Sequence, residues 1–233
     1  MLERKKIACL RGNREKILNV VLFGATGKSG LLVVEKLLSH GHRVTAYVRN
    51  PGKLCLQHKN LTVVQGALAD EGKIAAVIQA QDAVISLLGP SGKGHCHDLT
   101  LGLQWIVAAM KQHGVRRFIA ISTASATDPL DRFSFSFWLA IHAIKLLQPS
   151  AYNYFVQTAN LIRNSGLDWT LVRLGMLTDK ENSAPPALGY VGSKQIKLFS
   201  TSRNMLANFL VEQLNDTTWI QKAPAISNQS LKS

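Results

Sequence analysis

Three glycines near the start of the chain are spaced for binding an anionic group. They follow residues 17–23, a short and mostly apolar segment. The glycines and the polar residues between them are Gly24, Thr26, Gly27, Lys28, Ser29 and Gly30. Such glycines let a strand turn sharply, let the backbone approach a diphosphate and let the next helix pack closely on the sheet. The free N–H groups at the start of that helix favour an anion. The pattern predicts a dinucleotide diphosphate site, the alternative being a tight turn that binds nothing.

The end of the next β-rich segment, residues 43–48, indicates which dinucleotide would bind. A site for NAD usually has Asp or Glu there, which binds both ribose hydroxyls. This chain has Arg49 instead, and Lys53 follows closely. A guanidinium suits a 2′-phosphate because it donates paired hydrogen bonds. The sequence therefore predicts NADP(H), with a solvated arginine at a strand end as the alternative.

Strand-like and helix-like segments alternate along the chain. This alternation predicts the α/β class, with a doubly wound parallel sheet in a single Rossmann-type domain. The expected strands are residues 17–23, 43–48, 61–65, 82–88, 117–121, 168–172 and, at an edge, 217–220. The expected helices are residues 29–40, 70–80, 99–113, 139–147, 152–164 and 204–214, with a loop over 179–194. We expect residues 17–226 to form the domain, after a basic N-terminal extension over 1–16 and before a disordered tail over 227–233.

Ligands of such sheets bind at the carboxyl ends of the strands, which singles out further residues. Leu87 and Gly89 end the fourth predicted strand, where the backbone would approach the cofactor. Asp70 follows the third strand beside the expected adenine position, and it would serve equally well as the N-cap of the next helix. Ser122 and Thr123 end the fifth strand, where they could donate to the nicotinamide amide or a substrate oxygen. Bonding to nearby backbone groups is the alternative for both.

The net charge indicates which partners to expect, and the cysteine content indicates the cellular compartment. The formal net charge is +13, but the basic residues are spread out except at the N-terminus. No zinc-finger spacing or aromatic RNA-binding box accompanies them, so nucleic acid is not the expected partner. Cys9, Cys55 and Cys96 are too few for a disulfide framework, which indicates the reducing cytoplasm. No apolar run is long enough for a transmembrane segment. Residues 95–97, His-Cys-His, lack distant partners, so no metal site is expected.

The glycine loop, Arg49 and the later segment 165–173 (SGLDWTLVR) together resemble the atypical short-chain dehydrogenase/reductase group. Within that group the chain is similar to NAD(P)H-binding, NmrA-like and flavin reductase/biliverdin reductase B-like members, over about residues 17–226. The resemblance implies NADP(H) as the cofactor, with its nicotinamide near Ser122 and Thr123. It also implies a C-terminal part that closes over the substrate.

The catalytic pair of standard short-chain dehydrogenases is missing from this sequence. Those enzymes use Tyr-x-x-x-Lys, but Val156 stands four residues after Tyr152, and Thr158 four residues after Tyr154. Flavin reductase-like members lack the pair as well, because hydride transfer needs geometry and the proton can come from solvent.

We therefore expect an NADPH-dependent oxidoreductase that reduces a flavin, a quinone or a similar conjugated acceptor. Ser122 or Thr123 would orient the acceptor. No proton donor is assigned, and Tyr152 is only a candidate. The alternative is a non-catalytic NADP(H) redox sensor or a scaffold that acts through a protein partner.

Residues 133–138 are rich in aromatic side chains and leave several interpretations open. They could form a flat apolar wall for the acceptor, or belong to the core or a dimer surface. The longer stretch 133–147 could also touch a membrane surface, while His142 and Lys145 fit a lid or a partner-facing helix equally well. A homodimer or a regulatory protein partner thus remains open.

Overall fold

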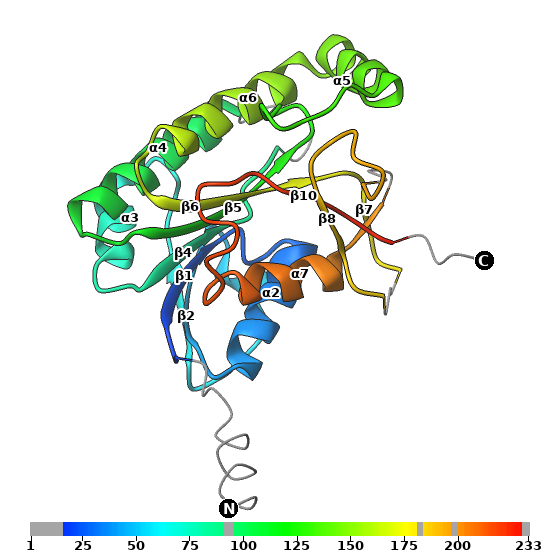
Figure 1. Cartoon of the computed structure of the whole chain (residues 1–233). Helices are drawn as coiled ribbons and strands as arrows, with labels where there is room; N and C mark the ends of the chain where they lie inside the picture. The colour runs from blue at the N-terminus through cyan, green and yellow to red at the C-terminus, as the bar shows by residue number, and fades with distance from the viewer. Residues whose placement is uncertain (1–15, 91–95, 181–183, 197–199, 230–233) are drawn as a thin grey trace, which may run out of the picture.

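An eight-stranded sheet forms the centre of the protein (Figure 1). The computed structural model describes residues 16–90, 96–180, 184–196 and 200–229, so nearly all of the expected N-terminal extension lies outside them. The strand order is β3-β2-β1-β4-β5-β6-β10-β8, and all neighbours are parallel except β10 and β8. The strands are β1 (Asn19–Phe23), β2 (Arg43–Val48), β3 (Leu61–Gln65), β4 (Ala83–Ser86), β5 (Arg117–Thr123), β6 (Asp168–Leu174), β8 (Ala187–Gly189) and β10 (Ala225–Ser227). This order confirms the single Rossmann-type α/β domain.

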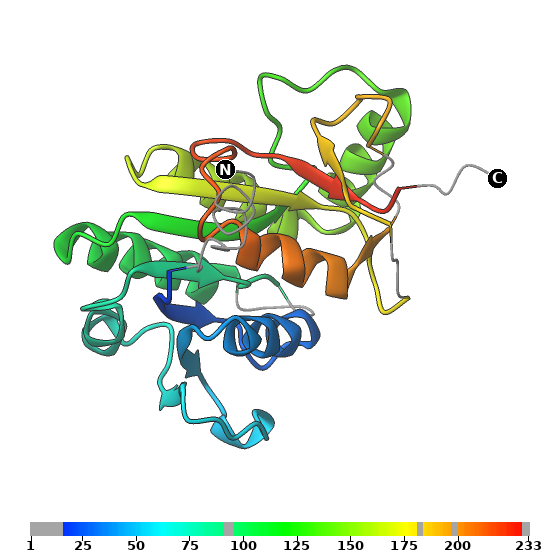
Figure 2. The ribbon, with the colours of Figure 1, turned by 60° about the horizontal axis from the view of Figure 1, so that its bottom comes forward.

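Helices cover both faces of the sheet (Figures 1 and 2). On one face, α2 (Lys28–Ser39) and α7 (Arg203–Glu212) pack against each other. On the other face lie α3 (Glu71–Ile78), α4 (Cys96–Gln112) and α6 (Pro149–Arg163). The remaining described elements are η1 (Pro51–Lys53), α5 (Phe135–Leu147) and the paired strands β7 (Leu177–Thr178) and β9 (Thr201–Ser202).

The apolar run of β1 reflects burial on both faces. Val20 and Leu22 belong to the cluster beneath α2 and α7, while Val21 and Phe23 belong to the cluster beneath α4 and α6. Successive side chains of a strand point to opposite faces, so a strand covered on both sides must be apolar throughout. The same rule explains the first three residues of β4, Ala83, Val84 and Ile85, which are buried and apolar.

The C-terminal elements differ from those expected. Residues 217–220 are wrong as an edge strand, because they form a turn before Gln221, whose φ is +55°. The strand is β10 instead, and it lies inside the sheet between β6 and β8. Ser227, assigned above to a disordered tail, ends β10 and is fully buried. The loop expected over 179–194 contains the short strand β8.

Three helices begin three or more residues earlier than the apolar spacing predicted. α4 begins at Cys96 rather than at residue 99. α5 begins at Phe135, and α6 begins at Pro149 rather than at Tyr152. Proline suits the first turn of a helix because it has no N–H to leave unbonded there. The aromatic stretch therefore enters a helix instead of lying in a loop.

Candidate cofactor site

The three loop glycines meet three different structural demands. Gly24 has a φ of +87°, and a Cβ there would lie 3.0 Å from the carbonyl oxygen of Leu87. A Cβ at Gly30 would lie 2.1 Å from the carbonyl oxygen of Gly24. A Cβ at Gly27 would meet only that same oxygen, at an ordinary 3.5 Å. The fold itself thus requires Gly24 and Gly30, whereas Gly27 leaves open space that a bound group could enter.

The start of α2 is suited to an anion. Gly27 is the N-cap residue, no side chain caps the helix and the first turn has no acidic residue. The partial positive charge of the helix therefore faces the loop without a protein anion to neutralise it. Thr26 is half-buried beside this loop, and Ser29 is half-buried in the first turn.

Lys28 makes an exposed ion pair beside the loop. Its Nζ lies 3.3 Å from Asp179 Oδ2, and Arg203 Nη1 lies 2.5 Å from Asp179 Oδ1. Hydrogen bonds from Lys28 first and Arg203 second lower the pKa of the Asp179 carboxyl below its usual value. Because Asp179 directly follows β7, this cluster links the glycine loop to the C-terminal part of the chain.

A cleft of about 340 Å³ opens where β1, β2 and β4 end. β1 lies between β2 and β4 in the sheet. The chain runs from β1 to α2 on one face and from β4 to α4 on the other face, so the cleft lies at the switch point where such sheets bind ligands. The lining residues are Phe23, Gly24, Thr26, Gly27, Tyr47, Val48, Arg49, Gly66, Ala67, Leu68, Ala69, Leu87, Leu88, Gly89, Asp98 and Leu99. Six of the predicted residues are therefore brought together, namely Gly24, Thr26, Gly27, Arg49, Leu87 and Gly89.

Arg49 stands exposed at the mouth of this cleft, directly after β2. Its backbone oxygen accepts a hydrogen bond from Gln65 Nε2 at 3.4 Å. Among the described residues, none accepts a hydrogen bond from its guanidinium or forms an ion pair with it. Lys53 is also exposed, at the end of η1, but it does not line the cleft. The guanidinium is thus free to bind a ligand anion.

The wall at the end of β3 contains residues that the sequence did not single out. A Cβ at Gly66 would lie 2.0 Å from the Tyr47 hydroxyl oxygen, which explains the glycine. The Tyr47 hydroxyl donates to the carbonyl oxygen of Ala67 at 2.8 Å. Burial chiefly, and the charge of Asp70 next, raise the pKa of Tyr47. Gly66 after a strand was the signal that could have pointed to this wall.

Asp70 caps α3, which is the alternative considered from the sequence. Its carboxylate accepts a hydrogen bond from the backbone N–H of Lys73 at 3.0 Å and lies 3.5 Å from Lys73 Nζ. It does not line the cleft.

Ser122 and Thr123 lie at the carboxyl end of β5, beside β4. Ser122 is buried, and among the described residues no partner binds its Oγ. Thr123 Oγ1 accepts a hydrogen bond from the Ser125 N–H at 3.3 Å, so this side chain satisfies a backbone group. An unsatisfied buried hydroxyl costs free energy, which makes Ser122 the better candidate of the two, but neither residue lines the cleft.

The tyrosines of α6 do not form an acid–base pair. The Tyr154 hydroxyl donates to the carbonyl oxygen of Leu88 at 3.1 Å, and burial raises the pKa of this phenol. Tyr152 lies instead toward α5, with Lys145 Nζ 5.6 Å from its ring centroid. Phe155 comes within 3.9 Å of the position of a Cβ on Gly89. The face of α6 at the end of β4 is therefore aromatic, and Tyr152 is not part of the cleft wall.

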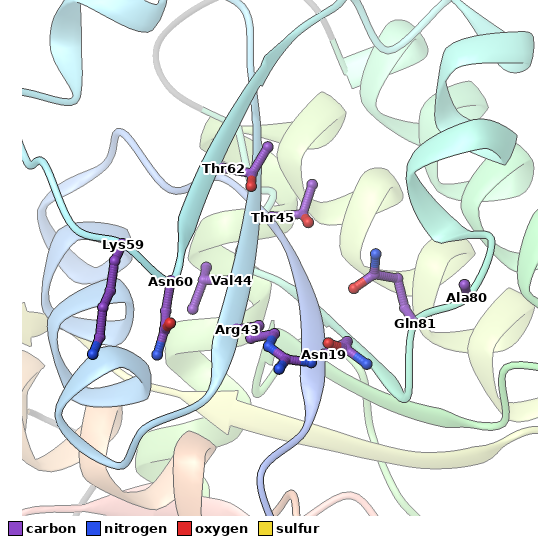
Figure 3. A pocket seen from close by; sticks show the side chains of 9 residues that line it. All are labelled: Asn19, Arg43, Val44, Thr45, Lys59, Asn60, Thr62, Ala80 and Gln81. Atoms are coloured by element: carbon purple, nitrogen blue, oxygen red, sulfur yellow. The ribbon is translucent and has the colours of Figure 1, made fainter.

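A second hollow lies at the amino ends of the strands, opposite the end that carries the glycine loop (Figure 3). It measures about 310 Å³ and is polar. Its lining residues are Asn19, Arg43, Val44, Thr45, Lys59, Asn60, Thr62, Ala80 and Gln81. Asn19 and Arg43 begin β1 and β2, so the full length of these strands separates the hollow from the glycine loop.

Two features are absent from the residues that the structure describes, a metal-binding cluster and a membrane-spanning helix. No cluster of three or more His, Cys, Asp and Glu there could hold a metal ion. Of the predicted His-Cys-His segment, His95 lies outside the described residues, and Cys96 and His97 begin α4. No helix in the same ranges is long and apolar enough to cross a membrane.

A family model described as NAD(P)H-binding matches residues 24–217. The match begins at the first glycine of the loop and spans most of the chain. The chain belongs to the NAD(P)H-binding family. This finding confirms the resemblance that the sequence motifs suggested.

Known proteins resemble this chain in sequence or in fold. The UPF0659 protein YMR090W of Saccharomyces cerevisiae is 28% identical over 211 residues, 84% of this chain and 87% of that protein. A short-chain dehydrogenase/reductase from Veillonella parvula, solved in complex with NADP, has a TM-score of 0.73 at 20% identity and covers 91% of this chain and 95% of its own. ChuY, an anaerobillin reductase from Escherichia coli O157:H7, has a TM-score of 0.73 at 19% identity, with 92% and 99% covered. The two structures share the fold.

Proposed function

We propose that this member of the NAD(P)H-binding family is an NADPH-dependent reductase of a conjugated small molecule, such as a flavin or a quinone. The observation that carries the proposal is the end of β4. There Phe155 faces Gly89, and the Tyr154 hydroxyl is bonded to the carbonyl oxygen of Leu88. Chemistry that needs a protein acid–base pair finds none on this face of α6, whereas hydride transfer to a conjugated acceptor needs only alignment.

The residues of the cleft fit the cofactor. Gly27 and the uncapped start of α2 would hold the diphosphate, and the Arg49 guanidinium would bind a 2′-phosphate. The reduced nicotinamide supplies a hydride at one face of its ring. Ser122, whose buried hydroxyl has no hydrogen-bond partner in the part of the chain that the structure describes, would orient the nicotinamide amide or the acceptor. The proton that completes the reduction would come from solvent.

Two of the structural relatives support this choice. One was solved with NADP, and ChuY is described as an anaerobillin reductase. Reduction of a conjugated small molecule therefore occurs on this fold, which raises the expectation for the present chain by analogy.

The choice of NADPH over NADH predicts a reversal of preference in Arg49→Glu. Replacing a guanidinium that binds a phosphate with a carboxylate removes charge-assisted hydrogen bonds, so we expect NADPH affinity to fall about 10- to 100-fold. NADH affinity should stay level or rise, because a carboxylate can bind the ribose hydroxyls. Fluorescence titration of both cofactors measures this change. Arg43→Glu is the matched control, since Arg43 is exposed at the other end of the same strand. An unchanged NADPH preference in Arg49→Glu would refute the assignment.

Turnover is tested by following NADPH absorbance with FMN, FAD and several quinones. We expect at least one acceptor to be reduced, and Ser122→Ala to slow that reaction more than it weakens NADPH binding, because the diphosphate and the 2′-phosphate would be held by other residues. Tight NADPH binding without turnover across the panel would favour the redox sensor or scaffold instead. The missing Tyr-x-x-x-Lys pair is the observation that favours the redox sensor or scaffold as the second candidate function.

A further inference from the structure

The α5 helix is unusually exposed for its composition. None of its 13 residues is buried, although most are apolar. Figures 1 and 2 show it beyond the end of the sheet, beside the start of α6. We call its exposed apolar residues, together with Phe133 before it, the α5 patch. The patch consists of Phe133, Phe135, Trp138, Leu139, Ile144, Leu146 and Leu147, with exposed fractions from 39% to 81%.

The contacts of α5 attach it to the body without covering the patch. It packs against α6, and the half-buried Phe137 joins a small cluster with Val191, Ile196 and Ala225. A helix that is apolar on all sides is normally covered on all sides. At about 20 Å, 13 helical residues are too short to cross a bilayer, so a surface rather than a span would cover them.

The charge around α5 indicates the chemistry of that surface. No Asp or Glu occurs between Asp131 and Asp168, whereas Arg132 directly precedes the patch, Lys145 lies in α5, and the whole chain carries a formal net charge of +13. A second copy would bring an equal positive charge against the first, which opposes self-association. An anionic surface would be attracted instead.

The aromatic residues of the patch suit a boundary between water and lipid. The rings of Phe135 and Trp138 have centroids 5.9 Å apart, and Trp138 lies 4.2 Å from the His142 ring. Tryptophan is enriched at membrane interfaces, and helices that lie in the interface combine Trp, Phe and Leu with Lys or Arg. We propose that the α5 patch docks this protein on an anionic lipid bilayer, with α5 lying in the interface.

Docking through α5 would also orient the cofactor cleft. α5 is reached from the carboxyl end of β5, the edge of the sheet at which the glycine loop lies. The acceptor side would then face the bilayer, into which apolar quinones partition. This consequence rests on the proposed reductase function, whereas the docking itself does not.

Co-sedimentation with lipid vesicles tests the docking. The full chain is mixed with phosphatidylcholine vesicles, with and without phosphatidylserine. We expect binding to the phosphatidylserine vesicles that weakens with added salt. Leu146→Ser combined with Leu147→Ser should lower this binding at least about tenfold, because two exposed leucines would enter the lipid. Ile17→Ser with Val63→Ser is the matched control, since both residues are exposed and apolar but lie away from α5.

Fluorescence identifies the part of the chain that enters the lipid. The emission of Trp138 should shift to shorter wavelength on phosphatidylserine vesicles, and Trp138→Phe should lose that shift. Equal sedimentation of the leucine double variant and the wild type would overturn the proposal, as would no binding to either vesicle. A stable dimer in light scattering that the same variant dissociates would assign the patch to a second copy and also overturn it. NADPH titration of each variant without vesicles keeps this outcome separate from the reductase proposal.

Discussion

Gly27→Val is expected to abolish NADPH binding without destabilising the fold. The φ of Gly27 is −77° and its ψ is 160°, an extended conformation that valine adopts readily. Its Cβ would meet only the Gly24 carbonyl oxygen, at an ordinary 3.5 Å, so a Cβ fits there without moving the backbone. The valine side chain would enter the space in front of the start of α2 that the diphosphate needs. Losing two charge-assisted hydrogen bonds would lower NADPH affinity at least about 100-fold.

Gly30→Ala is the contrasting variant. Its Cβ would lie 2.1 Å from the Gly24 carbonyl oxygen, a backbone atom that can move only if the loop moves. We expect this variant to lose both cofactor binding and thermal stability, measured by fluorescence titration and thermal unfolding. If Gly27→Val still bound NADPH like the wild type, the diphosphate would have to bind somewhere other than this loop.

The part of the site near the glycine loop was predictable because it depends on local rules. A strand buried on both faces is an unbroken apolar run, and a glycine must follow it where the chain turns and where the helix packs. Gly24, Gly27 and Arg49 could therefore be placed from sequence spacing, and all three line the cleft.

Contacts between distant segments decided the features that were not predicted. Residues 217–220 have strand-like composition, but Thr170 Oγ1 donates to the Trp219 carbonyl oxygen and the Gln221 N–H donates to the Trp169 carbonyl oxygen, which fixes a turn. β10 has only three residues, and its place between β6 and β8 depends on pairing that no local pattern encodes. Likewise, Tyr47 belongs to the cleft because Gly66, directly after the neighbouring strand β3, leaves room for its hydroxyl.

The largest expected loss of stability comes from Asp131→Ala. Its partner Arg173 lies on β6 and is fully buried, and the two make paired hydrogen bonds at 2.6 and 2.7 Å. Arg173 Nε also donates to the Ala223 carbonyl oxygen at 2.8 Å, and Asp131 Oδ1 accepts from the Val191 N–H at 3.0 Å. Removing one partner of a buried pair leaves the other charge uncompensated, which costs about 3–5 kcal/mol in free energy of unfolding. Urea unfolding followed by tryptophan fluorescence measures the loss.

Two control variants test whether the loss of stability comes from the uncompensated charge of Arg173 rather than from substitution in general. Arg116→Ala breaks the exposed pair with Asp168 and should leave unfolding unchanged within error, because exposed ion pairs contribute little. Asp131→Leu combined with Arg173→Met removes both charges, so it should recover much of the stability that Asp131→Ala loses. If Asp131→Ala were as stable as Arg116→Ala, the Arg173 guanidinium could not be buried in solution as it is here. The ion pair joins β6 to the segment that leads into α5, so the position of α5 would depend on the same two charges.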